Sequence, residues 1–360
     1  MPPLVSILIP GYNAERWIGD TIRSALAQTW PRKEIIIVDD GSDDQTLRVA
    51  QQFACEKVLV VTQQNQGAAA TRNRAFGLCQ GDYIQWLDAD DLLSPDKVAR
   101  QVAAAQECQD KRRLLSSGWG YFMHRPDKAK FVPTALWSDL TPVEWLLRKW
   151  EQNLHMQTAT WLVSRELTEV TGPWDTRLMG DDDGEYFCRT ILASSGVSFV
   201  PEAKVFYRIT GSNRWSYIGQ SDKKLEAHLL SRRLQIGYLR SVEDNDRVRA
   251  GCLKYLQTSF FNFYPERVAL VSQMQQLATM LGGQLEIPKL PWKYRWIQKL
   301  FGFTVAKRAR QRWNRYKSFV IRSWDKALFH LEARKSTDFE PEIRVMPGCT
   351  KLFSSRQSLL

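Results

Sequence analysis

The chain has 360 residues, 44% of them hydrophobic and 25% charged, which allows a buried core and excludes an intrinsically disordered protein. At this length we expect two or three domain-sized units at most. The net charge of +11 is local, because the segment from Lys289 to Lys335 contains 14 Lys and Arg but two acidic residues, so the rest of the chain is close to neutral.

The six cysteines are scattered, with no C-x-x-C pair and no adjacent histidine, so the sequence indicates neither a disulfide framework nor a zinc site. We therefore expect a reducing, cytoplasmic setting. The chain has no run of about 18 apolar residues, and its N-terminus has a short apolar run without a basic region before it. The sequence predicts neither a membrane span nor a signal peptide.

The first half of the chain alternates between strand and helix patterns. Short runs rich in Val and Ile, and a fourth apolar run, predict strands at 5–10, 34–38, 58–62 and 83–87. The segments between them predict helices at 14–28, 44–53 and 67–79. This alternation is typical of an α/β fold with a mostly parallel sheet.

A polar cluster follows each of these four strands: Gly11 to Asn13, Asp39 to Ser42, Gln63 to Gly67, and Asp88 to Asp91. In a parallel sheet the carboxyl ends of the strands meet at one edge, where ligands bind. We therefore expect the four loops to form one site.

The residue types in these loops suit a nucleoside diphosphate. Tyr12 offers an aromatic face for a base, Asp40 a carboxylate that can read its edge, and Asp88 to Asp91 oxygen ligands for a cation. Mg²⁺ and Mn²⁺ prefer oxygen ligands and often share them with substrate phosphates. Arg72 is placed where a helix can carry its guanidinium toward a phosphate. The alternative for the aspartates is a solvated turn before a helix capped by Ser94.

Farther along the chain, strand patterns continue at 114–131, 158–164, 197–201 and 203–207, and helical patterns dominate from about Ser221. A second acidic cluster, Asp181 to Glu185, precedes a helical run at 186–193. A loop at 210–216, rich in glycine and small polar residues, could close over a diphosphate. The Pro-rich stretch 287–292 predicts a hinge before the basic segment.

Three stretches resemble the nucleotide-binding half of the inverting glycosyltransferase family 2: PGYNAERWIGDTIRSALAQTW, EIIIVDDGSDDQT and NQGAAATRNRAFGLCQGDYIQWLDADD. The resemblance covers about residues 3–210. It implies the GT-A fold, a Rossmann-like, mostly parallel mixed sheet flanked by helices, here followed by a mainly helical C-terminal region. We accordingly expect a glycosyltransferase domain at 1–215, with a nucleotide-binding half to about 110 and an acceptor half at 111–215, a helical basic region at 216–335, and a poorly structured tail at 336–360.

The resemblance also implies roles for single residues. The aspartate matching Asp40 contacts uracil or an equivalent base, Tyr12 lies against that base, and Asp88 and Asp90 contact the ribose and the metal. Asp91 is then left as a turn and helix-start residue. The expected donor-binding residues are Pro10, Tyr12, Asp40, Gly67, Arg72, Asp88 and Asp90, with Asp90 and Asp88 as ligands of Mn²⁺ or Mg²⁺.

Inverting transfer needs a base that takes the proton of the acceptor hydroxyl. The family has an acidic pair that opens a helix and is followed by an arginine. Matching that arginine to Arg189 places the pair at Asp182 and Asp183 and the base at Asp183, with Asp182 as the alternative. Trp174 lies where the family positions the acceptor and offers an apolar face for a sugar, and a place in the core is its alternative.

In the basic segment, apolar residues recur at steps of three or four among the cations, at Trp313, Tyr316, Val320, Trp324, Leu328 and Leu331. A basic, tryptophan-rich amphipathic helix can lie on an anionic membrane surface. Packing on the protein or an oligomer contact is the alternative. No nucleic-acid-binding motif accompanies the charge, so we expect no nucleic-acid partner.

The sequence thus favours a metal-dependent, inverting glycosyltransferase that uses a nucleoside-diphosphate sugar. Among such donors, a UDP-sugar is favoured. Its acceptor would be a glycan, lipid-linked or protein hydroxyl in polysaccharide, glycolipid or protein-glycan assembly, and its location cytoplasmic and peripheral on the membrane. Without the Q-x-x-R-W motif of processive members, we expect transfer of one or a few sugars. The alternatives are a nucleotidyltransferase, which would need a Gly-rich basic phosphate loop where PGYNAERW stands, and a non-catalytic scaffold with a degenerate transferase domain.

Overall fold

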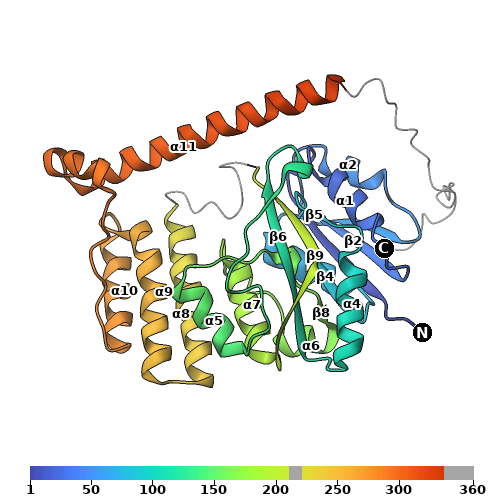
Figure 1. Cartoon of the computed structure of the whole chain (residues 1–360), viewed down its shortest axis with the longest axis horizontal. Helices are drawn as coiled ribbons and strands as arrows, with labels where there is room; N and C mark the ends of the chain where they lie inside the picture. Colours follow the sequence, from blue (N-terminus) through green and yellow to red (C-terminus); the bar gives the residue numbers. More distant parts are fainter. Residues whose placement is uncertain (211–220, 336–360) are drawn as a thin grey trace.

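The computed structural model describes residues 1–210 and 221–335, and side chains as far as Glu332. The predicted closing loop at 210–216 therefore lies outside the described residues except for Thr210, and so does the predicted tail at 336–360. The described chain forms two sheets, a group of helices beside them, and one long helix that crosses the molecule (Figure 1).

The first sheet has the strand order β3-β2-β1-β4-β8. Ile7 in β1 pairs with Ile35 in β2, and both are buried, because helices cover the faces of such a sheet. Four strands are parallel: β1 (Val5–Gly11), β2 (Lys33–Asp39), β3 (Val58–Thr62) and β4 (Tyr83–Trp86); β8 (Val163–Ser164) is antiparallel to β4.

The helices between these strands are shorter than the sequence pattern predicts. They are α1 (Ile18–Leu26), α2 (Thr46–Gln51) and α3 (Ala68–Leu78). The start of α2 has a local cause, because the Asp44 carboxylate accepts a hydrogen bond from the Thr46 N–H at 2.9 Å and so holds a turn before the helix.

The second sheet has the order β5-β9-β6-β7, formed by β5 (Leu92–Leu93), β9 (Gly196–Arg208), β6 (Arg113–Phe122) and β7 (Lys130–Phe131). The patterns at 197–201 and 203–207 join into the single strand β9, whose register on β6 shifts between Ser117 and Gly118. Pro201 falls in this shift, where it need not donate to the ladder. Of the strand predicted at 158–164, only β8 is in a sheet, because Thr158–Thr160 form the 3₁₀ turn η2.

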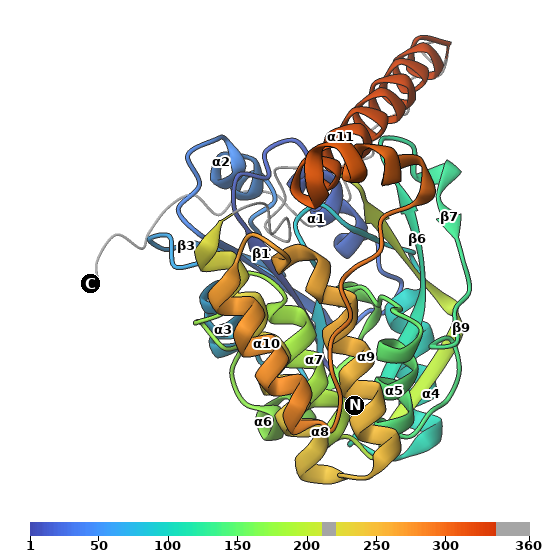
Figure 2. The ribbon, with the colours of Figure 1, turned by 90° about the vertical axis from the view of Figure 1, so that its left-hand side faces the viewer.

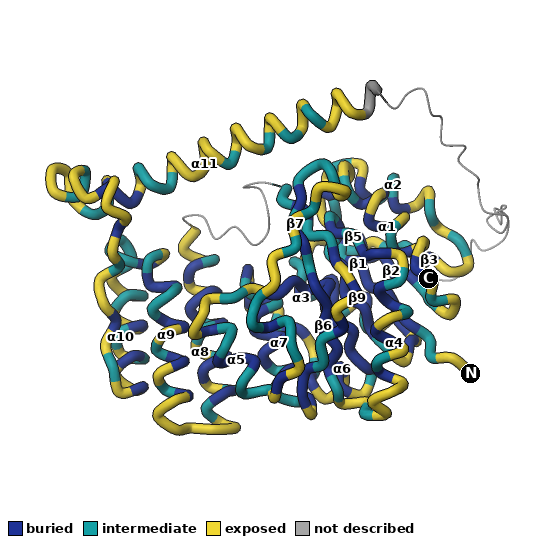
Figure 3. Tube along the Cα trace, viewed as in Figure 1, coloured by how far each residue is buried: buried dark blue, intermediate teal, exposed yellow. Residues whose placement is uncertain are grey.

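One apolar core connects the sheets with the C-terminal helices. It runs from Leu8 in β1 to Leu285 and includes Trp86, Trp145 and Trp150. The C-terminal helices lie beside the sheets (Figure 2), and buried stretches of the chain occur in both (Figure 3). The helices around it are α4 (Lys97–Cys108), α5 (Pro142–Glu151), α6 (Arg165–Thr171), α7 (Asp182–Ala193), α8 (Asp222–Val242), α9 (Asp246–Phe263) and α10 (Val268–Met280). The helices α8 to α10 therefore share the core of the first half, while the predicted domain limits stay predictions.

The helix α11 (Arg295–Lys335) follows the 3₁₀ turn η3 (Trp292–Tyr294) and is interrupted at Gly302, whose φ of 84° lies in the left-handed region that glycine adopts readily. Beyond the break, the buried Lys307 ammonium pairs with Glu266 at 2.7 Å and donates to the Tyr264 carbonyl. A small apolar cluster around Tyr294 and Ala306 adds to this contact. This end of α11 is thus fixed to the end of α9.

The other end of α11 is held by Arg125, between β6 and η1 (Pro126–Lys128). Its guanidinium pairs with Asp325 and with Glu332, each at 2.8 Å. The helix crosses the molecule between these two attachments (Figure 1). Within residues 1–210 and 221–335, no helix combines the length and the apolarity that a membrane crossing requires.

Candidate active site

A cavity of about 620 Å³ lies at the carboxyl ends of β1, β2 and β4, and a volume of this order accommodates a nucleotide-sized ligand. All four predicted loops contribute to its wall. So do all seven predicted donor-binding residues, Pro10, Tyr12, Asp40, Gly67, Arg72, Asp88 and Asp90, and also Asp182 and Asp183. The fold thus brings the two acidic clusters to one cavity, although the binding role of each residue stays a prediction.

Asp40 organises the loop after β3. Its carboxylate accepts hydrogen bonds from the Gln63 amide at 2.7 Å and from the backbone N–H groups of Gln66 and Gly67 at 2.9 and 2.8 Å. Gly67 has a φ of 89°, which a residue with a side chain rarely adopts. Asp40 is buried at the cavity wall, and its three hydrogen bonds shape this loop.

The turn after β4 begins at Asp88, whose carbonyl accepts the N–H of Asp91 at 3.1 Å. Asp91 is fully buried, and its carboxylate accepts the backbone N–H of Arg208 at 2.8 Å. Burial raises the pKa of Asp91 well above its usual range, and the nearby charges of Asp90 and Asp88 add to the rise. The prediction of Asp91 as a helix-start residue is wrong, because α4 begins at Lys97 and Asp91 instead ties the turn to β9.

Arg208 is a site-building residue that the sequence pattern does not single out. Its guanidinium donates to the Asp90 carbonyl at 2.9 Å and pairs with Asp20 at 3.3 Å. It also lies between the rings of Trp17 and Phe122, 4.6 Å from each centroid. The only signal for Arg208 in the sequence is its position at the end of a strand pattern, and many surface residues have such a position.

Arg72 links the two acidic clusters. Its guanidinium pairs with Asp182 at 2.6 Å and with Asp88 at 2.8 Å, and the side chains of Arg72 and Asp182 are 8% and 6% exposed. Burial alone would lower the pKa of Arg72, but Asp182 and Asp88 more than offset it and raise this pKa. Burial raises the pKa of Asp182 to about 6, with Asp183 and Asp88 adding to the rise and Arg72 opposing it. Removing one charged side chain from this buried network would leave another buried charge without compensation, which is strongly destabilising.

Trp174 is part of the core, so the prediction that it offers a sugar-binding face is wrong. It is 2% exposed and stacks on Tyr186 with ring centroids 3.9 Å apart. Its backbone N–H and C=O bond the Asn73 side chain at 2.8 and 2.9 Å, and its ring lies 4.4 Å below the Arg72 guanidinium. Trp174 therefore supports the Arg72 network from behind.

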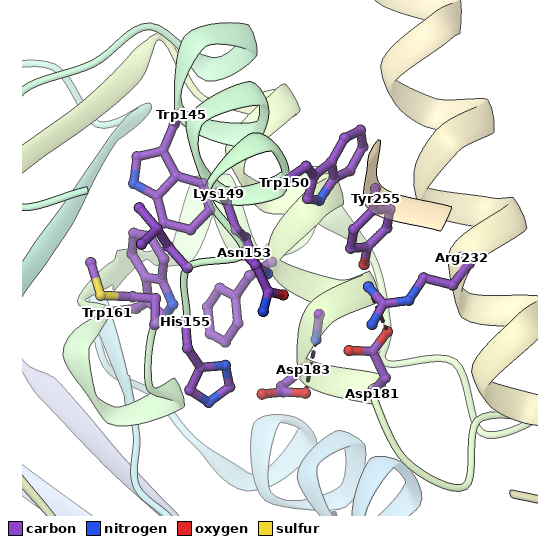
Figure 4. A pocket seen from close by; sticks show the side chains of 14 residues that line it. Trp145, Lys149, Trp150, Asn153, His155, Trp161, Asp181, Asp183, Arg232 and Tyr255 are labelled. Atoms are coloured by element: carbon purple, nitrogen blue, oxygen red, sulfur yellow. Dashed lines mark hydrogen bonds and ion pairs between the residues drawn. The ribbon is translucent and has the colours of Figure 1, made fainter. Parts of the chain in front are cut away.

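A second cavity, of about 110 Å³, adjoins the first at the start of α7 (Figure 4). Trp145, Trp150, Trp161 and Tyr255 give it aromatic walls, and Lys149, Asn153 and His155 give it polar groups. Asp183 lines both cavities. The carboxylate of Asp183 accepts the Gly184 N–H at 2.9 Å and, unlike that of Asp182, forms no ion pair within the described residues. A carboxylate so placed can accept a proton from a group in either cavity.

The start of α7 is anchored to α8 by a cluster that the sequence pattern does not reveal. Asp181 accepts hydrogen bonds from the Ser231 hydroxyl at 2.7 Å and the Gln235 amide at 3.1 Å, and Arg232 lies 3.9 Å away. Burial would raise the pKa of Asp181, but Arg232, His228 and Lys149 lower it to about 2. This cluster fixes the residue that directly precedes Asp182 and Asp183.

The carboxylates of Asp88 and Asp90 can supply part of the coordination shell of a divalent cation, and a substrate would supply other ligands. One oxygen of Asp88 is bound by Arg72, and Asp90 accepts a hydrogen bond from the Thr210 hydroxyl at 3.1 Å. Among the residues that the structure describes, no three His, Cys, Asp or Glu side chains form a ready-made metal site. Mg²⁺ and Mn²⁺ are commonly held by one or two carboxylates while phosphates and water complete the shell, which is the arrangement these residues can offer.

The comparison with protein families finds a match in the first half of the chain. The model for glycosyl transferase family 2 matches residues 6–136, which include the four loops and Arg72. Residues 6–136 are therefore similar to glycosyl transferase family 2. The resemblance expected from the sequence is thereby confirmed, while Asp182 and Asp183 lie beyond the matched residues.

The chain is similar to curated proteins over about a third of its length or less. It is 43% identical over 130 residues to TuaG of Bacillus subtilis, a glycosyltransferase whose name assigns it to teichuronic acid biosynthesis, covering 35% of this chain and 49% of TuaG. It is 46% identical over 98 residues to a chondroitin synthase of Escherichia coli, covering 27% of this chain and 14% of that protein. The matches thus span half or less of the length of these relatives.

Solved structures of TarS from S. aureus resemble the chain over a longer range. TarS 1-349 matches with a TM-score of 0.57 and 19% identity, over 76% of this chain and 78% of that one. Its complex with UDP-GlcNAc matches with a TM-score of 0.58 and 17% identity, over 77% and 81%. At this identity the likeness concerns the fold alone, and it confirms the predicted GT-A fold with its helical C-terminal continuation.

Proposed function

We propose that this chain is an inverting glycosyltransferase that moves a sugar from a nucleoside-diphosphate sugar to an acceptor hydroxyl. The observation that carries the proposal is the position of Asp183, which lines both the larger and the smaller cavity. A donor in the larger cavity and an acceptor in the smaller one would meet beside this carboxylate. A nucleotidyltransferase or a scaffold gains no support from the family-2 match.

The surroundings favour Asp183 over Asp182 as the base. Asp182 is 5% exposed and paired with Arg72 at 2.6 Å, so taking a proton there would leave a buried arginine with less compensation. Asp183 is half-buried and reaches both cavities. A base must lie within hydrogen-bond reach of the proton that it removes.

The reaction is then a single displacement. The acceptor oxygen attacks the anomeric carbon opposite the diphosphate, the bond from that carbon to the phosphate oxygen breaks, and its electron pair leaves with the nucleoside diphosphate. Asp183 takes the hydroxyl proton as the new bond forms. The aromatic side chains of the smaller cavity would contact the apolar faces of an acceptor sugar, while Lys149 and His155 would bind its polar groups.

The leaving diphosphate needs compensation for its charge. Asp88 and Asp90 would hold Mn²⁺ or Mg²⁺, which when bound stabilises the charge that develops on the leaving group. The UDP-GlcNAc complex of TarS supports a UDP-sugar as donor. The names of TuaG and of chondroitin synthase support a role in polysaccharide assembly, and we propose a cytoplasmic site for the reaction.

The test combines a binding and a transfer measurement. With Mn²⁺ present, UDP should raise the thermal unfolding temperature of the wild-type chain, and a panel of UDP-sugars should include one that is consumed. Asp183→Asn should lower the turnover by about 10²- to 10⁴-fold, the usual contribution of a general base, and keep the UDP response. Asp127→Asn is the control, because Asp127 is 62% exposed and lies outside the residues that line either cavity.

Two results would contradict the proposal in different ways. If neither UDP nor GDP changes the unfolding temperature with metal present, the larger cavity is not a donor site. If Asp183→Asn retains full turnover, the base is Asp182 or another group.

A further inference from the structure

The helix α11 carries an apolar stripe on the side turned away from the protein. Val305, Trp313, Tyr316, Val320 and Trp324 are each between 45% and 68% exposed. Their spacing keeps them on one side of a helix. The residues that attach α11 to the protein, Lys307 and Asp325, lie roughly a third to half of a helical turn away from most of the stripe. The stripe is therefore not the face that packs on the protein.

Uncompensated cations flank this stripe: Arg308, Arg312, Arg315, Lys317 and Lys326. In the part of the chain that the structure describes, none of these five has a carboxylate within ion-pair distance. The two acidic residues of the segment, Asp325 and Glu332, are both paired with Arg125 on the protein side. The outer face thus presents aromatic rings bordered by positive charge alone.

A second exposed apolar group lies at the start of the same helix. Trp292, Trp296, Leu300 and Phe301 are between 58% and 80% exposed. They precede or adjoin the break at Gly302, at the end of the segment opposite to Trp324 (Figure 1). Large apolar groups gathered on a surface mark a binding face rather than ordinary exposure.

We propose that the outer face of α11 binds the surface of an anionic lipid bilayer. Tryptophan and tyrosine rings are suited to the boundary between head groups and acyl chains, and flanking Lys and Arg are attracted to anionic head groups. A second copy of the chain fits less well, because stripe-to-stripe packing would bring the same cationic flanks together. Charge complementarity therefore selects the lipid surface.

The attachment of α11 places the larger cavity on the bilayer side. The His124 ring lies 6.2 Å from Phe329 on α11 and 5.8 Å from Trp17, which lines the cavity. The helices α1 and α2, which follow the carboxyl ends of β1 and β2, lie on the side over which α11 passes (Figures 1 and 2). An acceptor carried by a lipid would thus be presented to the cavity side of the protein.

Vesicle flotation tests this proposal independently of sugar transfer. The full chain should float with vesicles that contain phosphatidylglycerol, bind pure phosphatidylcholine at least tenfold more weakly, and lose binding as salt is raised. A variant with Trp313→Ser, Tyr316→Ser, Val320→Ser and Trp324→Ser should bind the anionic vesicles at least tenfold more weakly. The matched control replaces exposed apolar residues of α10, Val268→Ser and Met280→Ser, and should bind like the wild type.

Circular dichroism and the UDP response establish that the variants are folded. If the stripe variant and the α10 control bind equally, or the wild type does not float with anionic vesicles, the proposal is overturned. It is also overturned if the wild type sediments as a dimer, the stripe variant as a monomer, and neither binds vesicles, because α11 is then a self-association face.

Discussion

At the residue scale, neighbours give the aspartates of the cavity different tasks. Asp40 accepts three hydrogen bonds and shapes a loop, and the buried Asp91 accepts the backbone N–H of Arg208. Asp182 is paired with Arg72, which leaves Asp183 at the junction of the two cavities. Residues of one chemical type thus become structural or reactive through their contacts, which is why we assign the base to Asp183.

His228 is a buried group that the fold keeps neutral. It is 5% exposed, and its ring stacks on Phe263 and lies 3.3 Å from the Arg232 guanidinium. Burial lowers the pKa of His228 to about 4, Arg232 adds to the decrease, and Asp181 opposes it. The folded-state pKa is below the unfolded value of about 6.5, so its stabilising effect is complete above about pH 6.5 and is lost as the pH falls through about 4.

We predict that His228→Gln makes the free energy of unfolding less sensitive to acid. Between about pH 7 and pH 4.5 the wild type should lose about 2 kcal/mol more than His228→Gln, measured by urea unfolding at both pH values. His330→Gln is the control, because His330 is exposed on α11 and should behave as the wild type does. Equal losses in the wild type and His228→Gln would contradict this prediction.

At the element scale, side chains far apart in the sequence hold the site together. Asp181 fixes the start of α7 on α8 through Ser231, and Arg125 fixes the far end of α11. These two attachments consist of polar contacts between a few side chains. The start of α11 is instead attached through an apolar cluster and the buried Lys307. The two ends of α11 should therefore differ in how easily they detach.

We predict that Arg125→Ala frees the far end of α11 and leaves its start in place. Amide hydrogen exchange should become several-fold faster at residues 313–332 than in the wild type, with little change at 303–309. Arg177→Ala removes the ion pair between the exposed Arg177 and Asp175 and serves as the control, with no effect on α11. Unchanged exchange at 313–332 would mean that other contacts hold the helix.

The sequence patterns predict the elements whose cause is local. Runs rich in Val and Ile identify β1, β2 and β3, and an apolar run identifies β4. The loops after these strands converge because parallel strands end at one edge. The start of α2 depends on the Asp44 side chain. Two strand patterns join into β9 through a register shift at Ser117. The periodicity of the sequence encodes neither feature.

The missed parts of the site depend on contacts between distant residues. Arg208 and Asp90 are 118 residues apart, and Arg72 and Asp182 are 110 apart. Trp174 is an aromatic residue of the type that often binds sugars. Only the packing of Tyr186 and Arg72 around it assigns it to the core. Such contacts follow from the assembled fold and leave no periodic signal in the sequence.

At the scale of the whole molecule, the core that supports the site ends before the basic segment. The large apolar cluster extends to Leu285, while Leu290, Tyr294 and Ala306 form a separate small cluster. The fold of the sheets and of α8 to α10 should therefore not depend on α11 for its stability.

We predict that a chain ending at Glu286 keeps the fold and the donor site. Its thermal unfolding temperature should lie within about 5 °C of the wild-type value, its response to UDP and Mn²⁺ should remain, and its binding to anionic vesicles should disappear. The matched comparison is the full-length stripe variant, which should share the loss of vesicle binding. Aggregation of the shortened chain or loss of its UDP response would show that α11 supports the site.

The attachment of α11 at both ends has a kinetic consequence. Lys307 holds one end of the helix to Glu266, and Arg125 holds the other end at Asp325. The orientation of α11 relative to the rest of the protein is therefore fixed at two points. A chain resting on lipid through such a helix would keep one height and one tilt, and would meet lipid-borne acceptors by lateral diffusion in two dimensions. Its rate would then follow the mole fraction of acceptor in the bilayer rather than the acceptor concentration in the bulk solution.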